Sequence, residues 1–247
     1  MGDHDDAARY AAAAGRLLLG LRDEAEHAGG SPGALGDTGD ERANRCLLEL
    51  LESEHPGDLV LSEESADDRR RLDAERVWIV DPLDGTREFT ESGRRDWAVH
   101  VALWERGVGV QVGAVALPAD GVVVSTGSPP VVPERGDRPV RLVVSRTRPP
   151  SVAERVAAAL DAEVVPLGSA GAKTMAVVRG DVDAYVHAGG QYEWDSAAPT
   201  AVARAAGLHT SRLDGAPLVY NRPEPWLPDL LVCRPELTEA ILAVTSS

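Results

Sequence analysis

Lysine is almost absent from this chain of 247 residues, because Lys173 stands alone among 25 basic residues that are otherwise arginines. The 40 acidic residues outnumber the basic ones and give a formal net charge of −15 at pH 7. A broad nucleic-acid-binding surface needs a basic field, so this charge excludes nucleic acid as a partner. An anionic small molecule remains open as a substrate, because bound cations can reverse the local field.

Long hydrophobic runs and cysteines are also scarce. No stretch approaches the roughly 18 apolar residues of a membrane-spanning helix, so no membrane partner is predicted. The acidic start, residues 1–6, lacks the basic and apolar regions of a secretory signal, which predicts a cytoplasmic protein. The two cysteines, Cys46 and Cys233, lie in apolar contexts and are predicted to be buried thiols rather than a disulfide or a zinc site.

Apolar spacing and turn residues predict an α+β first part. Residues 6–25 repeat apolar side chains at helical spacing, and a second helix is expected over 40–53. The segment 28–36 between them is rich in Gly, Ser and Pro and is expected to be a mobile loop. Alternating or continuous apolar runs predict strands at 58–62, 76–80, 97–104, 108–117 and 122–124.

The second part begins after residues 127–139, which hold four prolines and mark the predicted boundary between residues 1–138 and 139–247. Beyond this segment, strand and helix patterns alternate. The predicted elements are strands at 140–144, 163–166 and 182–187 and helices at 151–160, 170–179 and 195–206. Such alternation is typical of an α/β layer, so the whole chain is predicted to be α/β.

The densest chemical signal is WIVDPLDGT at residues 78–86. An apolar strand delivers Asp81, and Pro82 is expected to turn the chain because proline cannot continue a strand ladder. Asp81 and Asp84 can then point into one pocket, where two carboxylates suit Mg²⁺ better than zinc. Gly85 permits close approach of a ligand, and the N–H groups of Gly85 and Thr86 open a short helix that favours a phosphate. The alternative is an Asp-rich turn that caps a helix.

Further acidic residues support the metal-site hypothesis only when they are considered together with Asp81 and Asp84. Each of them alone has an ordinary structural interpretation. Glu63 and Glu64 follow a predicted strand, where a solvated acidic pair is the ordinary interpretation. Asp195 opens a predicted helix, where a plain N-cap is the ordinary interpretation. His100 and His187 fall in strand patterns without a metal-ligand partner at useful spacing, so packing or surface positions are predicted for both.

Five segments resemble the inositol monophosphatase superfamily, and within it the CysQ-type 3′(2′),5′-bisphosphate nucleotidases. They are LSEES (61–65), DPLDGT (81–86), DWAVHVAL (96–103), GSAGAK (168–173) and EWDSAAPTAVARAAG (193–207). The resemblance extends over residues 6–233. It implies a layered α/β/α/β/α sugar-phosphatase fold, with the active site in the cleft between the two parts.

The resemblance also implies a site that holds two or three Mg²⁺ ions. The implied metal ligands are Glu63, Asp81, the carbonyl of Leu83, Asp84 and Asp195. Thr86 with Asp40 would orient the attacking water, although Asp37 lies close enough in sequence to take that role. Gly85 and Thr86 would hold the phosphate.

The resulting expectation is Mg²⁺-dependent hydrolysis of the 3′-phosphate of 3′-phosphoadenosine 5′-phosphate to AMP by a metal-activated water. No G-x-S-x-G motif supports a covalent nucleophile. Alternatives are the same chemistry on inositol 1-phosphate or fructose 1,6-bisphosphate, or a catalytically silent metal- or anion-binding protein. The resemblance further implies lithium sensitivity and a role in sulfate assimilation, and it leaves a homodimer open.

Candidates for the nucleoside side of the cleft lie in the second part: Arg146, Ser169, Lys173 and Glu193. Lys173 is expected to present its ammonium to the cleft near the start of a helix, where it could meet a phosphate or ribose oxygen. The alternative for Lys173 is a solvated helix residue, and for Arg146 a surface cation.

Overall fold

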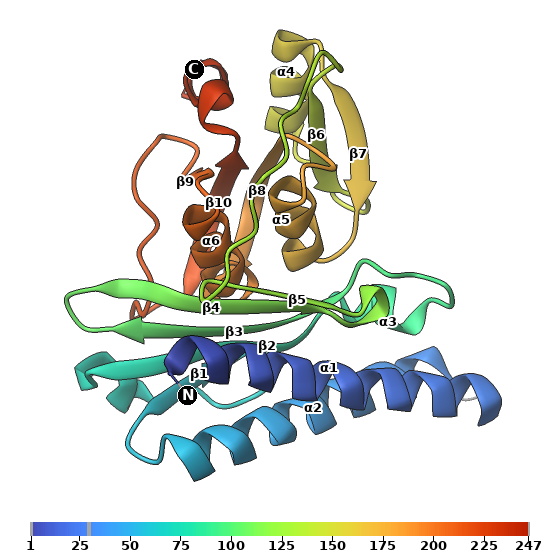
Figure 1. Cartoon of the computed structure of the whole chain (residues 1–247), viewed down its shortest axis with the longest axis vertical. Coiled ribbons are helices and arrows are strands. Elements are labelled where there is room, and N and C mark those ends of the chain that lie inside the picture. Colours follow the sequence, from blue (N-terminus) through green and yellow to red (C-terminus); the bar gives the residue numbers. More distant parts are fainter. Residues whose placement is uncertain (1, 29–30, 247) are drawn as a thin grey trace.

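The computed structural model describes residues 2–28 and 31–246 and contains two five-stranded sheets with helices between and outside them (Figure 1). The strands of the first sheet lie in chain order, and only the first pair is parallel. These strands are β1 (Leu59–Ser62), β2 (Arg76–Asp84), β3 (Ala98–Glu105), β4 (Gly109–Leu117) and β5 (Val122–Ser125).

The second sheet is mixed and has the strand order β7-β6-β8-β10-β9. Strand β6 pairs in parallel with β7 and β8, whereas β10 is antiparallel to both of its neighbours. Its strands are β6 (Arg141–Ser145), β7 (Glu163–Leu167), β8 (Ala184–Tyr192), β9 (His209–Ser211) and β10 (Trp226–Cys233).

Helices complete the layers seen in Figure 1. Helices α1 and α2 cover one face of the first sheet, α5 and α6 lie between the sheets, and α4 and α7 pack beyond the second sheet. The helices are α1 (Asp3–Ala28), α2 (Pro32–Glu54), α3 (Thr86–Thr90), α4 (Ser151–Leu160), α5 (Ala170–Val178), α6 (Glu193–Ala205) and α7 (Thr238–Thr245), and single 3₁₀ turns are η1 (Arg69–Asp73), η2 (Pro118–Asp120) and η3 (Pro235–Leu237). The predicted α/β/α/β/α layering is confirmed.

The core between the two sheets belongs to both. One cluster of buried side chains joins Val77 and Ile79 of β2 to Met175 of α5 and Val202 of α6. Helix α6 lies tight against the first sheet, since a Cβ at Gly113 of β4 would be 3.0 Å from the carbonyl oxygen of Ala198. The sheets fall on either side of residues 138 and 139, and the division into two parts at that point stays a prediction.

Helix α2 begins eight residues earlier than the sequence pattern predicts. Residues 29 and 30 of the expected loop lie outside the described residues, but the segment from Pro32 onward is helical. Ser31 caps this helix by accepting a hydrogen bond from the Ala34 N–H at 3.3 Å, and Pro32 occupies the first turn. The loop prediction for 32–36 is therefore wrong, because serine, proline and glycine here begin a helix and do not form a turn.

Two further differences concern strands. The chain does not leave the sheet at Pro82; β2 continues to Asp84, with a register shift against β3 between Asp81 and Asp84. Three elements of the structure, β9, β10 and α7, are not predicted by the sequence patterns. Both cysteines are free thiols, as predicted, but Cys46 is only half-buried. None of the described helices combines the length and hydropathy needed to cross a membrane.

Candidate metal and phosphate site

Three carboxylates from two distant parts of the chain meet between the two sheets. One oxygen from each of Asp81, Asp84 and Asp195 lies within 4.8 Å of the others. The register shift in β2 brings Asp81 and Asp84 to the same place, and the start of α6 supplies Asp195. The Asp81 side chain is 1 % exposed, and its Oδ2 atom is buried without a hydrogen-bond partner.

Asp84 is held by the first turn of α5. It accepts hydrogen bonds from the N–H groups of Ala170 at 3.1 Å and Gly171 at 2.6 Å, and from the hydroxyl of Ser169. Burial alone would raise the pKa of Asp84. The charge of His100 and the hydrogen bonds that Asp84 accepts outweigh that effect and hold the pKa of Asp84 at about 2. Asp84 is therefore ionised at neutral pH.

The neighbouring acidic groups bind protons more tightly than usual. Burial, followed by the charge of Glu63, raises the pKa of Asp81 well above its ordinary value. Burial and then the charge of Asp84 raise the pKa of Asp195 to about 6. The side chain of Glu63 reaches solvent, yet partial desolvation and then the charge of Asp195 raise its pKa to about 8.

This excess of negative charge fits a divalent cation. A bound cation would relieve the mutual repulsion of the carboxylates and would supply the missing partner of the Asp81 Oδ2 atom. The donor set is composed of carboxylate oxygens, which suit Mg²⁺. The residues present therefore fit the implied metal.

Thr86 and Asp40 lie together beside the carboxylates. The Thr86 hydroxyl lies 3.3 Å from Asp40 Oδ1 and 3.3 Å from the Leu83 carbonyl oxygen, and it can donate to either. Burial, followed by the charge of Glu64, raises the pKa of Asp40 to about 6. Thr86 opens helix α3 after Gly85, whose φ of 89° lies in the left-handed region that favours glycine.

Asn44 of α2, which is not among the predicted site residues, holds the turn that bears Glu63. Its amide accepts from the Ser62 hydroxyl at 2.7 Å and donates to the Ser65 hydroxyl at 3.1 Å. The Glu64 N–H closes this turn on the Ser62 hydroxyl at 3.2 Å. No local sequence signal identifies Asn44, because its partners are about twenty residues further along the chain.

His100 is buried, as the packing alternative predicts, but its two ring nitrogens also face polar groups of the site. Its ring is 0 % exposed and lies between Asp84 and the start of α6. The Nδ1 atom is 3.0 Å from the Trp194 carbonyl oxygen, and the Nε2 atom is 3.2 Å from Asp84 Oδ2. Strand pairing could have revealed this position, because His100 is the cross-strand partner of Asp81. His187 bonds the Gly190 carbonyl oxygen at 3.0 Å.

The expectations for Lys173 are wrong. Its side chain is 5 % exposed, so it is not a solvated helix residue, and its ammonium is not open to the cleft. The ammonium donates to the carbonyl oxygens of Gly168 and of Ser169, the latter at 2.9 Å, and lies 5.2 Å from the centre of the Tyr185 ring. Burial lowers the pKa of this lysine. The ammonium of Lys173 thus stabilises the loop before α5 by hydrogen bonds to its backbone.

The other predicted nucleoside contacts already have protein partners. Arg146 donates to Glu88 at 2.5 Å and to Glu91 at 2.7 Å, which links the two parts of the chain. The buried Glu193 carboxylate accepts from the N–H groups of Asn221 at 2.6 Å and Arg222 at 2.9 Å, and so anchors the segment before β10. Ser169 caps α5 by accepting from the Ala172 N–H at 2.9 Å.

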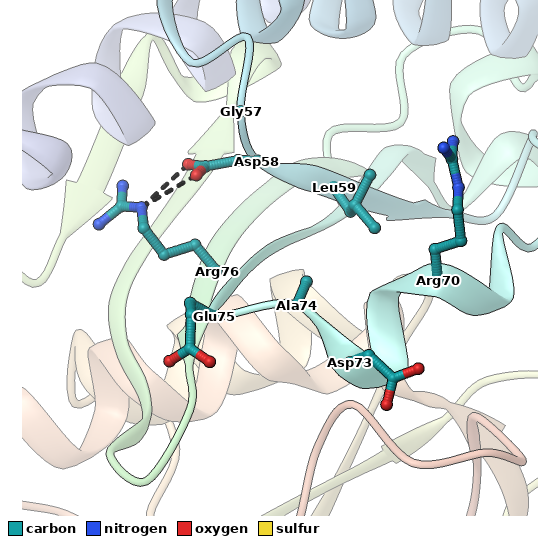
Figure 2. A pocket seen from close by; sticks show the side chains of 8 residues that line it. All are labelled: Gly57, Asp58, Leu59, Arg70, Asp73, Ala74, Glu75 and Arg76. Carbon is teal, nitrogen blue, oxygen red and sulfur yellow. Dashed lines mark hydrogen bonds and ion pairs between the residues drawn. The ribbon is translucent and has the colours of Figure 1, made fainter.

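A surface pocket of about 390 Å³ lies elsewhere, between η1 and the start of β2 (Figure 2). Its lining includes an ion pair between Asp58 and Arg76. The Nε atom of Arg76 lies 3.0 and 3.1 Å from the two carboxylate oxygens of Asp58. A strand rises about 3.3 Å per residue, so Arg76 lies about 17 Å from Asp81 along β2. None of the clustered carboxylates lines this pocket, so the pocket is separate from the acidic cluster.

Known proteins match the chain over most of its length. A 3′-phosphoadenosine 5′-phosphate phosphatase of Mycobacterium leprae is 53 % identical, over 96 % of this chain and 91 % of its own. The 3′(2′),5′-bisphosphate nucleotidase CysQ of Escherichia coli is 31 % identical, over 76 % and 80 %. The crystal structure of inositol monophosphatase II from Staphylococcus aureus superposes with a TM-score of 0.80 at 20 % identity, over 96 % and 94 %.

A family model agrees with these relatives and with the layered architecture. The model of the inositol monophosphatase family matches residues 6–246, which include every carboxylate of the cleft. The fold, the position of the acidic cluster and the sequence comparisons thus lead to one conclusion. The chain belongs to the inositol monophosphatase family.

Proposed function

We propose that this chain is a Mg²⁺-dependent phosphatase that converts 3′-phosphoadenosine 5′-phosphate to AMP and phosphate. The observation that carries the chemistry is the convergence of Asp81, Asp84 and Asp195, together with the lack of a hydrogen-bond partner for the buried Asp81 Oδ2 atom. The substrate is supported by the M. leprae relative of that name, which is 53 % identical to this chain.

The metal ligands in this proposal are Glu63, Asp81, the Leu83 carbonyl oxygen, Asp84 and Asp195, which would hold two or three ions. When bound, Mg²⁺ lowers the pKa of water and neutralises charge on the phosphoryl oxygens. The carboxylates of Asp81 and Asp84 come from one strand, and Asp195 faces them from α6. Substrate would therefore react between the two sheets.

Thr86 and Asp40 are proposed to orient the attacking water. With its hydrogen directed to Asp40, the Thr86 hydroxyl oxygen has lone pairs free to accept from a water. The raised pKa of Asp40, about 6, leaves it ionised and able to accept from Thr86 at neutral pH. The backbone N–H groups of Gly85 and Thr86 would hold the phosphoryl oxygens.

On the nucleoside side, Arg146 is proposed to contact the substrate by exchanging one of its two carboxylate partners for a phosphate. Ser169, Lys173 and Glu193 would act by holding the loops around the cleft, since their polar atoms are bound within the protein. A cytoplasmic location, a homodimer, lithium sensitivity and a role in sulfate assimilation stay predictions.

The proposal is tested by phosphate release with Mg²⁺ from three substrates in parallel: 3′-phosphoadenosine 5′-phosphate, inositol 1-phosphate and fructose 1,6-bisphosphate. We expect kcat/KM to be highest for the nucleotide, with little turnover when EDTA is present. A preference for a sugar phosphate would assign the chain to another activity of the family. No release from any substrate would indicate a silent metal- or anion-binding protein.

A further inference from the structure

One buried imidazole contacts both elements that bring the clustered aspartates together, strand β2 and helix α6. His100 lies on β3, directly opposite Asp81 of β2 in the sheet. Its Nδ1 atom is 3.0 Å from the carbonyl oxygen of Trp194, the residue before Asp195 in α6. Its Nε2 atom is 3.2 Å from the Oδ2 atom of Asp84. The ring therefore connects ligands that are more than a hundred residues apart in sequence.

The hydrogen-bond network assigns a direction to this ring. A carbonyl oxygen can only accept a hydrogen bond, so the Nδ1 atom must bear the hydrogen that faces Trp194. The bond fixes the ring in its plane and leaves Nε2 pointed at Asp84. The Nδ1 atom also lies 3.8 Å from Asp81 Oδ2, so the ring is close to both aspartates of β2.

Helix α5 closes the remaining side of the ring. A Cβ at Gly171 would lie 2.1 Å from the Nε2 atom, so the backbone of α5 is in direct contact with the imidazole. The Gly171 N–H donates to the same Asp84 oxygen that faces Nε2, at 2.6 Å. Asp84, the backbone of α5 and the start of α6 thus bound the ring on three sides.

We propose that His100 is a positioning residue that fixes Asp84 and the Asp195-bearing end of α6 to one ring and thereby sets the affinity of the cleft for its divalent cation. The inference rests on the proposed metal-dependent function. Carboxylates repel one another when no cation is present, so a rigid tether keeps them at ligand spacing. Loss of a group that orients metal ligands typically weakens metal binding about 10- to 100-fold.

Substitutions of His100 separate positioning from packing. His100→Leu keeps an apolar side chain of similar size and removes both polar contacts, and we expect Mg²⁺ to bind about 10- to 100-fold more weakly. In His100→Asn, the side-chain amide can take the place of Nδ1–H and keep the bond to Trp194. This variant should recover part of the lost affinity, whereas a residue that only fills space would favour the leucine.

Gly171 provides a second test that does not depend on either His100 variant alone. Gly171→Ala should displace the ring and weaken Mg²⁺ binding, because the new methyl group occupies the position of Nε2. Asparagine lacks an atom at that position. Gly171→Ala should therefore cost little further affinity in a His100→Asn background, and this coupling identifies the imidazole as the group through which Gly171 acts.

The measurement is calorimetric titration of each folded, metal-free variant with Mg²⁺ in the absence of substrate, with His209→Asn as a histidine control on β9. At saturating Mg²⁺ the KM for the nucleotide should be unchanged in His100→Asn. Failure of the unmodified protein to bind Mg²⁺ would overturn the proposed function. Normal Mg²⁺ affinity in His100→Leu, or additive effects of His100→Asn and Gly171→Ala, would overturn the role of His100 alone.

Discussion

At the scale of single residues, Asp81 and Thr86 have different surroundings in the proposed site. Asp81 is buried among like charges and has one oxygen without a partner. Thr86 has a single hydroxyl that faces two acceptors at the same distance, 3.3 Å. Substitution of each residue should therefore change a different quantity, the charge of the site in one case and the orientation of water in the other.

Asp81→Asn removes a charge and keeps the shape of the side chain. We expect kcat/KM to fall at least about 100-fold, because the loss of a group that stabilises transition-state charge costs that much or more. In EDTA the variant should melt at a higher temperature than the unmodified protein, because repulsion within the acidic cluster falls. Asp73→Asn, in the pocket of Figure 2, is the matched control. Near-normal turnover by Asp81→Asn would contradict the assignment of the site.

Thr86→Val and Asp40→Asn should not have additive effects. The two side chains are proposed to act on one water through one hydrogen bond, so the loss of either removes most of the benefit of both. The measurement is kcat/KM for both single variants and the double variant at saturating Mg²⁺. Additive losses of transition-state free energy would count against Asp40, and a larger loss in Asp37→Asn would transfer its role to Asp37.

Lys173→Met tests the hydrogen bonds that the Lys173 ammonium donates to the loop before α5. Methionine fills a similar volume but leaves the carbonyl oxygens of Gly168 and Ser169 without their charged donor. We expect a loss of about 1.5–3 kcal/mol in the free energy of unfolding, measured with urea, since hydrogen bonds to charged groups contribute that much. Turnover of nucleotide and sugar phosphates should change by the same factor. A loss confined to the nucleotide would instead indicate direct contact with substrate.

The residues of the site differ in how well the sequence predicts them. Asp81, Asp84, Gly85 and Thr86 form one short motif, so local pattern alone predicted that they lie together. The position of His100 depends on Trp194, and that of Lys173 on how deeply α5 is buried between the sheets. Such contacts between distant elements are set by packing, which local spacing does not encode.

Helix α2 shows the same limit at the scale of the element. Its first turns contain glycines that resemble a loop, but one of them allows close packing: a Cβ at Gly39 would lie 2.9 Å from the Phe89 ring and 3.0 Å from Leu83. This contact presses α2 against the segment that bears Thr86 and brings Asp40, the next residue, to the site. Glycine here reflects a neighbouring element and not a turn.

Two substitutions in α2 should therefore have opposite signs. Gly39→Ala forces a methyl group into Phe89 and Leu83, and overpacking of this kind costs about 1–3 kcal/mol. Gly33→Ala meets no atom within 4 Å, and alanine in an exposed helix is about 0.5–1 kcal/mol more favourable than glycine. Urea unfolding of the two variants measures the difference. Equal effects would contradict the close packing of α2 on this segment.

At the scale of the whole molecule, an ion-pair network joins the predicted boundary segment to the second sheet. The Asp183 side chain is 0 % exposed and binds Arg138 at 2.6 Å and Arg234 at 2.7 Å. Arg138 belongs to the segment before β6, and Arg234 follows β10. Asp183 thus ties the segment before β6 to the end of β10, so this network should influence global stability and not the chemistry of the metal site.

Asp183→Asn should lower the free energy of unfolding by about 3–5 kcal/mol at pH 7, because two partly buried arginines lose their charged partner. Burial would raise the pKa of Asp183, but hydrogen bonds from Arg138, the Arg141 N–H and Arg234 outweigh it and lower the pKa. A lowered pKa stabilises the fold above the unfolded value, about 3.9, and this contribution is lost as the pH falls through the folded value.

The difference in stability between Asp183→Asn and the unmodified protein should therefore be constant above about pH 5 and shrink below about pH 4. Urea unfolding at a series of pH values measures it. Asp181→Asn is the matched control, because Asp181 pairs with Arg179 at an exposed position. A difference that grows as the pH falls would contradict a lowered pKa for Asp183.

The tight contact between α6 and the first sheet has a consequence for the spacing of the ligands. Asp195 is fixed to α6, so its distance from Asp81 and Asp84 depends on how closely that helix packs on the first sheet. Ala198 and Gly113 set that distance by their lack of bulk, only one helical turn beyond Asp195. The smallest side chains of the protein thus act as the spacer of its most highly charged region, and a single added methyl group there would change the ligand geometry without touching a ligand.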